Sequence, residues 1–291
     1  MINKLAIIGI GLIGGSFALA LRRAGMVKHI TGLGRSKKNL QQAQELGIID
    51  EASADYETAL EKTDLILLAM PVGQTTEILK KIKPFIGPKT IISDVGSTKQ
   101  DVVTSARLLI PESFKNFVPA HPIAGAELSG ANAANADLFV DKNIVLTPSD
   151  ETNINSIEIL SKLWQGCGAH ILSMKPYQHD ELLAMTSHLP HMLAFTFMNY
   201  IFSNSTKKNT ESLLNFSGGG FRDFTRIAES SPEMWRDICL ANRHLLLQQI
   251  RAYQNELAHM NELIEDGDGS ALEKFFLKSQ ITRKRLLNNK N

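Results

Sequence analysis

The chain opens with a glycine-rich segment that limits the folds open to it. An apolar run of strand length, residues 5–8, leads into Gly9, Gly11 and Gly14 in the spacing G-x-G-x-x-G, and a stretch of helical composition follows. In that order, Gly9 permits a tight turn, Gly11 lets a pyrophosphate approach the backbone, and Gly14 lets the helix pack close to the strand. The helix N-terminus also offers N–H groups to phosphates. The segment predicts a dinucleotide-binding unit; the alternative is a glycine-rich turn that binds nothing.

Composition excludes several classes of protein. A length of 291 residues suggests about two domains. The net charge of +1 gives no field that would attract nucleic acid or a membrane surface. No apolar stretch reaches the roughly 18 residues of a membrane helix, and the N-terminus lacks the features of a signal peptide. Cys167 and Cys239 lie far apart without metal-ligand spacing, which indicates free thiols in a reducing compartment. We therefore expect a cytoplasmic protein.

In the first half of the chain, short apolar runs alternate with amphipathic stretches. This rhythm predicts an α/β Rossmann-type domain, whose mostly parallel sheet is covered on both faces and binds ligands at the carboxyl ends of its strands. The expected strands are 4–9, 28–33, 64–69, 90–94, 116–119 and 143–147, with 169–173 as a possible last one, and the expected helices are 15–25, 37–46, 56–61, 74–83, 98–109 and 152–168.

Helical patterns fill the second half, from Tyr177 onward. Apolar residues recur there at helical spacing, and no stretch has the pattern of a strand. The chain thus divides into an NAD(P)-binding domain over 1–173 and an all-α domain over 174–291. The expected long helices cover 182–202 with an interruption at Pro190, then 233–265, and then a segment capped by Ser270 after the Gly-Asp-Gly of 267–269.

The end of the second strand bears on cofactor choice. NAD-binding folds usually carry an acidic residue there, which holds the ribose 2′-hydroxyl. Gly34 stands at about that position, and Arg35, Ser36 and nearby lysines could accept a 2′-phosphate instead. The segment favours NADP over NAD. The alternative is a solvent-facing basic turn that does not distinguish the two cofactors.

Two further segments follow strands of the predicted sheet. In Ser93–Lys99, Ser97 is suited to hydrogen-bond a substrate, although Ser97 or Thr98 could equally be a helix N-cap. In Pro119–Glu127, His121 stands at a strand end and is fixed by the proline after it. A histidine in that place suits proton transfer near neutral pH.

The helical half contributes two polar segments. Ser187–His191 places His188 and His191 within one helical turn; a metal site is conceivable, but no third ligand is evident, so substrate binding is favoured and no metal is expected. Gly218–Gly220 precede Arg222 and Arg226, which suits an anion clamp because arginine binds carboxylates bidentately. The alternative is a surface loop with a solvated arginine.

Together these segments resemble the prephenate/arogenate dehydrogenase family of tyrosine-biosynthesis oxidoreductases along nearly the whole chain. The resemblance implies a Rossmann-type domain followed by an all-α dimerisation domain, a homodimer, and a small cyclohexadiene substrate. It implies that a hydride leaves C4 of the ring for NAD or NADP, that the ring carboxylate leaves as CO₂, and that the ring becomes aromatic. The matching segments are 9–16, 94–99, 121–125, 187–191, 218–226 and 234–237.

The resemblance also assigns roles to residues. His121 matches the catalytic histidine that takes the proton of the C4 hydroxyl, and Ser97 matches a serine that supports this hydroxyl. Arg226 matches the arginine that holds a substrate carboxylate, and His191 lines the substrate pocket. Asp180, Glu127, Arg222 and Asp223 match a polar cluster around the pocket mouth, Ser187 and Gly219 join the substrate site, and Leu12, Ile13, Pro71 and Val72 join the glycines, Arg35 and Ser36 in the cofactor site.

Two other classes stay open. One is another two-domain NAD(P)-dependent dehydrogenase, such as a β-hydroxyacid dehydrogenase; those enzymes generally use a lysine of the helical domain as acid/base, whereas here a histidine follows the fifth strand. The other is an inactive protein that senses a dinucleotide, which would have no need of Ser97, His121 and Arg226 together. The sequence does not distinguish prephenate from arogenate as substrate.

Overall fold

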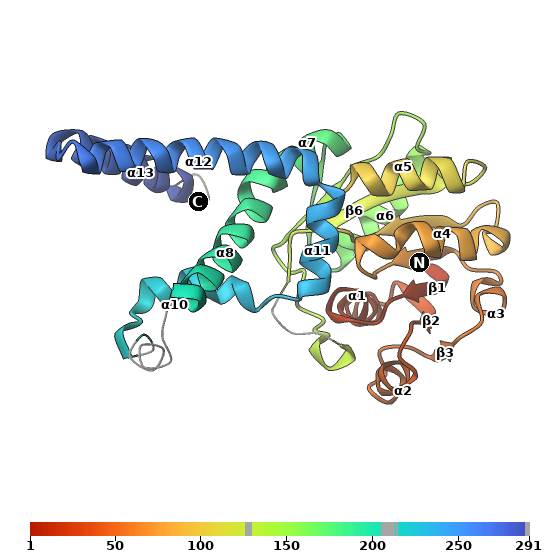
Figure 1. The fold of residues 1–291 in the computed structure, drawn as a ribbon. Coiled ribbons are helices and arrows are strands. Elements are labelled where there is room, and N and C mark those ends of the chain that lie inside the picture. The colour runs from red at the N-terminus through yellow and green to blue at the C-terminus, as the bar shows by residue number, and fades with distance from the viewer. Residues whose placement is uncertain (126–129, 205–212, 214, 289–291) are drawn as a thin grey trace. The chain divides into compact units, whose positions relative to one another are not determined.

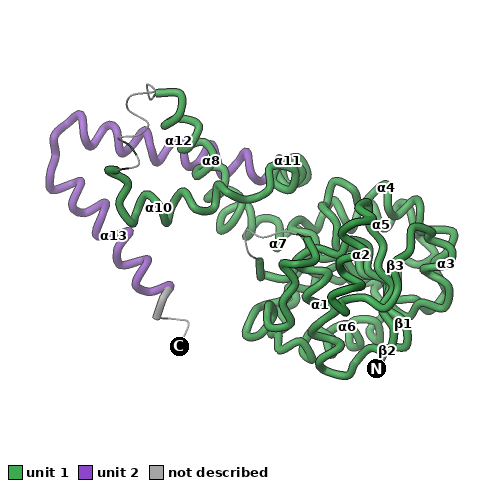
Figure 2. The backbone as a smooth tube through the Cα atoms, turned by 90° about the horizontal axis from the view of Figure 1, so that it is seen from below, with its two compact units in different colours: residues 1–243 green, residues 244–291 purple. Residues whose placement is uncertain are grey.

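The computed structural model describes residues 1–125, 130–204, 213 and 215–288. The chain packs as two compact units, residues 1–243 and residues 244–291 (Figure 2). The first unit contains the whole sheet and several of the helices that follow it. The division after residue 173, expected from the sequence, stays a prediction.

A single twisted sheet forms the centre of the first unit. Its strand order is β3-β2-β1-β4-β5-β6-β7-β8 among the described residues, and the order reverses beside β1, where chains of this class bind ligands. Strands β1 to β6 pair in parallel, β7 pairs antiparallel to β6, and β8 pairs in parallel with β7. The mostly parallel α/β sheet predicted from the sequence is confirmed. The strands are β1 (Ile2–Ile8), β2 (Val27–Leu33), β3 (Glu51–Ser53), β4 (Leu65–Leu68), β5 (Ile91–Asp94), β6 (Phe117–Pro122), β7 (Asn143–Leu146) and β8 (His170–Ser173).

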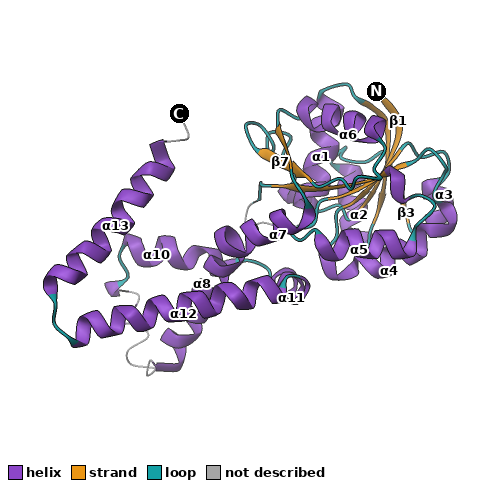
Figure 3. Ribbon diagram, turned by 90° about the horizontal axis from the view of Figure 1, so that it is seen from above, coloured by secondary structure: helices purple, strands orange, loops and turns teal. Residues whose placement is uncertain are grey.

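Helices cover both faces of this sheet (Figure 3). Alternate residues of β1 point to opposite faces, so Leu5 and Ile7 enter one apolar core while Ala6 and Ile8 enter the other. The first core is closed by α1 (Leu12–Arg23), α2 (Lys37–Glu45) and α6 (Ile154–Gly166), and the second by α3 (Tyr56–Leu60), α4 (Thr75–Ile82) and α5 (Gln100–Leu109).

Two features of the sheet differ from the expectation. The short edge strand β3 was not foreseen, because three half-exposed residues without an apolar run give no strand pattern. Strand β6 extends past residue 119 to Pro122, since His121 pairs with Val145 in the antiparallel ladder to β7. His121 is therefore held by a strand rather than by a loop.

The helices after the sheet begin with α7 (Pro176–Leu183), a π-helical turn (Ala184–His188) and α8 (Leu189–Asn204) (Figure 1). The helix expected over 182–202 is interrupted by this π-helical turn, which ends two residues before Pro190, whereas α8 itself runs through Pro190 without a break. The helices α10 (Gly219–Thr225) and α11 (Pro232–Ala241) complete the first unit, with a 3₁₀ turn (Arg226–Glu229) between them.

The helix expected over 233–265 is two helices. The first, α11, ends at Ala241, and α12 (Arg243–Glu265) begins after Asn242. Asn242 is buried, and its side-chain amide donates to the backbone carbonyl of Asp180 at 2.8 Å. This tertiary contact overrides the helical pattern of the sequence, which gives no sign of the break.

The second unit is an α-helical hairpin of α12 and α13 (Gly269–Asn288). Gly267 adopts a left-handed conformation at the bend, with φ of +64°. The expected cap at Ser270 is wrong: the cap is Asp268, two residues earlier, whose carboxylate accepts the N–H of Ala271 at 3.0 Å. No described helix combines the length and the apolar character that a membrane crossing requires.

Candidate active site

The glycine loop stands at the carboxyl end of β1. Gly9 has φ of +105°, and a Cβ on it would lie 2.5 Å from the carbonyl oxygen of Ala69. A Cβ on Gly14 would overlap the carbonyl oxygen of Gly9, whereas one on Gly11 would meet nothing within 4 Å. Helix α1 begins directly after Gly11 without a side-chain cap, so the N–H groups of its first turn are available to a phosphate. The loop has the shape that a dinucleotide needs.

A pocket of about 530 Å³ opens in front of this loop. Among the described residues that line it, none is acidic. Gly9, Gly11, Arg35, Ser36 and Pro71 line the pocket as expected from the sequence. Four expected cofactor residues are not in this lining: Leu12 and Ile13 form the first turn of α1, Gly14 is buried, and Val72 belongs to the apolar core. The rest of the lining consists of Ile8, Ile10, Gly34, Asn39, Tyr56, Ala69, Met70, Gln74, Ile78 and Gly130.

The polar side chains that follow β2 in this pocket have protein partners. The Arg35 guanidinium lies 3.5 Å from the Glu233 carboxylate of α11, and both side chains are exposed to solvent. Ser36 caps α2, since its hydroxyl accepts the N–H of Asn39 at 3.2 Å. Asn39 in turn donates to the Ile10 carbonyl at 2.6 Å and accepts the Ala131 N–H at 2.8 Å. Asn39, missed by the sequence reasoning, therefore ties the glycine loop to the segment around Ala131.

A buried ion pair fixes the ends of β5 and β6. Lys99 is fully buried; its ammonium group pairs with Asp94 at the end of β5 and donates to the carbonyl of Ala120 in β6 at 2.8 Å. Asp94 also accepts the N–H of Gly96 at 2.8 Å. Ser97 lies in the short loop held between these contacts and is half-buried. Lys99 belongs to the 94–99 motif of the sequence, from which no role was predicted for it.

Asp180 of α7 packs against the start of α5. Its carboxylate accepts the N–H of Lys99 at 2.8 Å and the N–H of Gln100 at 2.9 Å, which satisfies the first free donors of α5. Neither Ser97 nor Thr98 caps that helix with its side chain, so this alternative for the two residues is wrong. Asp180 is only 2% exposed, and its carboxylate is used in the interior instead of at a pocket mouth.

His121 is linked to Asp180 through a second histidine. Nδ1 of His121 lies 2.8 Å from Nε2 of His179, and Nδ1 of His179 lies 2.8 Å from a carboxylate oxygen of Asp180. His179 is fully buried and was not foreseen from the sequence. Burial, followed by the proximity of His179 and Lys99, holds the pKa of His121 well below its usual value. His121 is therefore neutral near pH 7, as a proton acceptor must be.

The two histidines of the 187–191 segment have different surroundings. His188 is buried and lies 3.2 Å from the Asn242 amide, and burial lowers its pKa to about 4. His191 donates from Nδ1 to the Ser187 carbonyl at 2.8 Å, and its ring stacks on Trp235 of α11 with centroids 4.0 Å apart. Among the described residues, no group of three or more His, Cys, Asp or Glu side chains could hold a metal ion.

The remaining expected substrate residues lie on the segment packed against α8. The glycines of 218–220 begin α10 instead of forming a loop, and Phe221 and Phe224 of α10 pack on Phe197 of α8 with centroids 6.0 and 5.6 Å apart. Gly219, Arg222 and Asp223 belong to α10 and Arg226 begins the next turn; all four are exposed. Glu127 lies outside the described residues.

Comparisons with known proteins extend over the same elements. Residues 17–173 match the family model "Prephenate dehydrogenase, nucleotide-binding domain", and residues 175–278 match "Prephenate dehydrogenase, dimerization domain". The chain is 35% identical to the prephenate dehydrogenase of Bacillus subtilis, over 95% of this chain and 74% of that protein. It is 34% identical to the cyclohexadienyl dehydrogenase of Zymomonas mobilis, over 97% of this chain and 95% of that protein.

Solved structures give the same result for the fold. The crystal structure of prephenate dehydrogenase from A. aeolicus, in complex with hydroxyphenyl propionate and NAD+, superimposes with a TM-score of 0.92 at 33% identity and covers 98% of this chain and 99% of that one. The resemblance inferred from the sequence is thus confirmed by sequence and by fold. The chain belongs to the prephenate dehydrogenase family of oxidoreductases.

Proposed function

We propose that this chain oxidises and decarboxylates a cyclohexadienyl substrate, prephenate or arogenate, with NAD or NADP as hydride acceptor. The observation that carries the proposal is a histidine held neutral by burial at the edge of the sheet where the glycine loop opens. A neutral imidazole is the group that such a reaction needs for the C4 hydroxyl. Relatives named prephenate dehydrogenase and cyclohexadienyl dehydrogenase support the substrate class.

In the proposed reaction, His121 handles the proton of the C4 hydroxyl, and the cofactor handles the hydride. When bound, the nicotinamide accepts the hydride that leaves C4 of the ring. His121 takes the proton of the C4 hydroxyl as the C4 carbonyl forms. When the ring carboxylate leaves as CO₂, the electron pair of the broken bond moves through the ring to the C4 oxygen. This oxygen then takes the proton back from His121. The ring ends aromatic, and His121 ends neutral, so no proton is consumed.

The other predicted residues bind the substrate. Ser97, in the loop after β5, supports the reacting hydroxyl, and His191 forms a wall of the pocket with its ring fixed on Trp235. Arg226 holds a substrate carboxylate, because the guanidinium group matches a carboxylate in a bidentate pair. Ser187, Gly219, Arg222, Asp223 and Glu127 complete the proposed substrate site, with Asp180 acting from behind His121.

For the cofactor we propose a preference for NADP. The pocket-lining residues Gly34, Arg35 and Ser36 follow β2, and no carboxylate lines the described part of the pocket. A carboxylate at that point would bind the 2′-hydroxyl of NAD and repel a 2′-phosphate. Arg35 forms an exposed ion pair with Glu233, a contact worth about 0–1 kcal/mol that a phosphate can replace.

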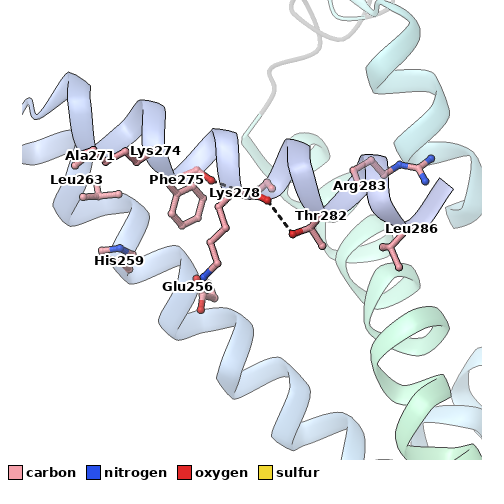
Figure 4. Close-up of a pocket in the computed structure, with 11 residues that line it drawn as sticks. Glu256, His259, Leu263, Ala271, Lys274, Phe275, Lys278, Thr282, Arg283 and Leu286 are labelled. Carbon is pink, nitrogen blue, oxygen red and sulfur yellow. Dashed lines mark hydrogen bonds between the residues drawn. The ribbon is translucent and has the colours of Figure 1, made fainter. Parts of the chain in front are cut away.

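We also propose that the chain works as a homodimer. In the second unit, α12 and α13 enclose a groove of about 830 Å³ whose lining includes Leu263, Phe275 and Leu286 (Figure 4). Phe276 and Leu277, on the same helix α13, are more than half exposed. Large exposed apolar surface is typical of an interface. A second copy of the chain is the proposed occupant, in line with the dimerization-domain model that matches this region.

Absorbance of the reduced nicotinamide tests the proposed function. Purified protein is supplied with NAD+ or NADP+ and, in turn, with prephenate, arogenate and a simple β-hydroxyacid. We expect reduced cofactor with at least one cyclohexadiene and none with the hydroxyacid. Reduction with the hydroxyacid alone would favour the other dehydrogenase class, and no reduction with any substrate despite dinucleotide binding would favour a sensor.

A further inference from the structure

Three hydrogen-bonded side chains, those of His121, His179 and Asp180, form a row that runs from the sheet edge into the interior. His121 of β6 contacts His179 of α7, and His179 contacts the neighbouring Asp180, each at 2.8 Å. The two imidazole rings meet edge to face, with centroids 5.0 Å apart and planes at 69°. His179 and Asp180 are both shielded from solvent, whereas His121 is partly exposed. This row of side chains therefore has one end, His121, at the surface of the site and the other end, Asp180, buried in the protein interior.

The buried end fixes the direction of the hydrogen bonds. The two oxygens of Asp180 accept the backbone N–H groups of Lys99 and Gln100 at 2.8 and 2.9 Å. Backbone donors stabilise the ionised form of a carboxyl group, and a carboxylate can only accept. Nδ1 of His179 must therefore carry the hydrogen that points at Asp180.

The direction of this hydrogen bond also fixes the direction of the one between His179 and His121. A neutral imidazole has one N–H, so with Nδ1 as the donor, Nε2 of His179 is an acceptor. The atom 2.8 Å from it, Nδ1 of His121, must then be the donor. This leaves Nε2 of His121 with a free lone pair, which is the form that can take a proton.

We propose that His179 is a positioning residue, which fixes the tautomer of His121 and is itself oriented by Asp180. A hydrogen bond on one ring nitrogen of histidine decides which nitrogen is protonated. Without it, His121 would divide its population between two tautomers, of which only one can act as a base through Nε2. His179 touches neither substrate nor cofactor in this role. The kinetic consequence rests on the proposed function, but the tautomer itself does not.

The tautomer can be measured in the ligand-free protein. Long-range ¹H–¹⁵N spectra of histidine-labelled protein at pH 7.5 separate protonated from unprotonated ring nitrogens, and the spectrum of His121→Asn assigns the His121 signals. We expect His121 and His179 each to be protonated at Nδ1 only. Protonation of His121 at Nε2, or of His179 at both nitrogens, would overturn the proposal.

Two substitutions separate tautomer control from simple packing. His179→Phe keeps the ring but removes both nitrogens, so His121 should become a mixture of tautomers in the spectrum. With an active substrate, kcat should fall by roughly 10–100-fold while KM stays within about threefold, as expected for a group that orients another. His179→Gln offers an amide oxygen to Nδ1–H of His121, and it should restore the Nδ1–H tautomer and most of kcat.

Ile82→Ala is the matched stability control. Ile82 is fully buried at the C-terminal end of α4, which lies at the opposite edge of the sheet from the carboxyl ends of the strands. The Ile82→Ala substitution should lower the melting temperature without changing kcat or the ¹H–¹⁵N signals of His121. An unchanged tautomer of His121 or a wild-type kcat in His179→Phe would refute the proposal. A His179→Gln variant whose kcat is as low as that of His179→Phe would also refute it. If the wild-type protein turns over no cyclohexadiene, the proposed function fails, and the spectra still decide the tautomer.

Discussion

At the scale of single residues, burial decides what the histidines of this site can do. His121 and His188 are both kept neutral by loss of solvent, although only His121 reaches the edge of the site. His121 was predicted from its sequence motif and its place after a strand. His179 and the role of Lys99 were not, because each depends on contacts between segments far apart in the chain. A motif identifies the reacting group, whereas its support is visible only in the fold.

Burial of His188 should make the protein sensitive to acid. Its pKa is about 4 in the folded protein and about 6.5 in an unfolded chain. Between these values the unfolded chain binds the proton and the folded one does not, so the free energy of unfolding falls by roughly 3 kcal/mol as the pH drops from 6.5 to 4. Urea unfolding of His188→Gln should show a shallower loss over that range. Equal slopes in the wild type and in His188→Gln would contradict this account.

Arg226 should affect substrate binding more than chemistry. The proposed pair with a substrate carboxylate exists before and during hydride transfer, so Arg226→Ala should raise KM strongly with a smaller change in kcat. Arg226→Lys should recover only part of the loss, since lysine lacks the bidentate geometry. Steady-state kinetics at saturating cofactor measure both. Wild-type KM values for prephenate and arogenate in Arg226→Ala would exclude this residue from the site.

At the scale of elements, the sequence predicts best where one local pattern determines the outcome. The apolar strands and the glycine turn before α1 follow from alternation and from a backbone that only glycine tolerates. The edge strand β3 has no such pattern. The break at Asn242 and the Asp268 cap arise from side-chain hydrogen bonds that compete with helical periodicity. Local patterns therefore predicted the sheet, and specific contacts set the helix ends.

The segment after β2 carries the prediction on cofactor choice. Gly34→Asp should shift preference toward NAD+, because the carboxylate would bind the 2′-hydroxyl and repel a 2′-phosphate. Arg35→Ala should weaken NADP+ more than NAD+. Dissociation constants for both nucleotides test this, with Lys28→Ala, an exposed lysine at the amino end of β2, as a charge-matched control. A wild type that strongly prefers NAD+, together with no effect of Arg35→Ala, would refute the NADP preference.

At the scale of the whole molecule, the proposed dimer rests on the α12–α13 hairpin, where Phe276 and Leu277 are more than half exposed. We expect a stable dimer of twice the 32.1 kDa chain, with an interface above about 2,000 Å². Phe276→Asp, on α13, should produce monomers in sedimentation velocity. Leu108→Asp, at an even more exposed leucine of α5 in the other unit, should leave the dimer intact. A wild-type protein that sediments as a monomer at working concentration would contradict the proposal.

Product stoichiometry tests whether His121 serves an oxidation that is coupled to decarboxylation. With substrate labelled at the ring carboxylate, reduced nicotinamide and labelled CO₂ are counted in the same reaction for wild type and His121→Asn. We expect equal amounts of the two products from the wild type. Both rates should fall together by roughly 10²–10⁴-fold in the variant, while nucleotide and substrate binding persist. Reduced nicotinamide without CO₂, or a variant with near-normal turnover, would contradict the account.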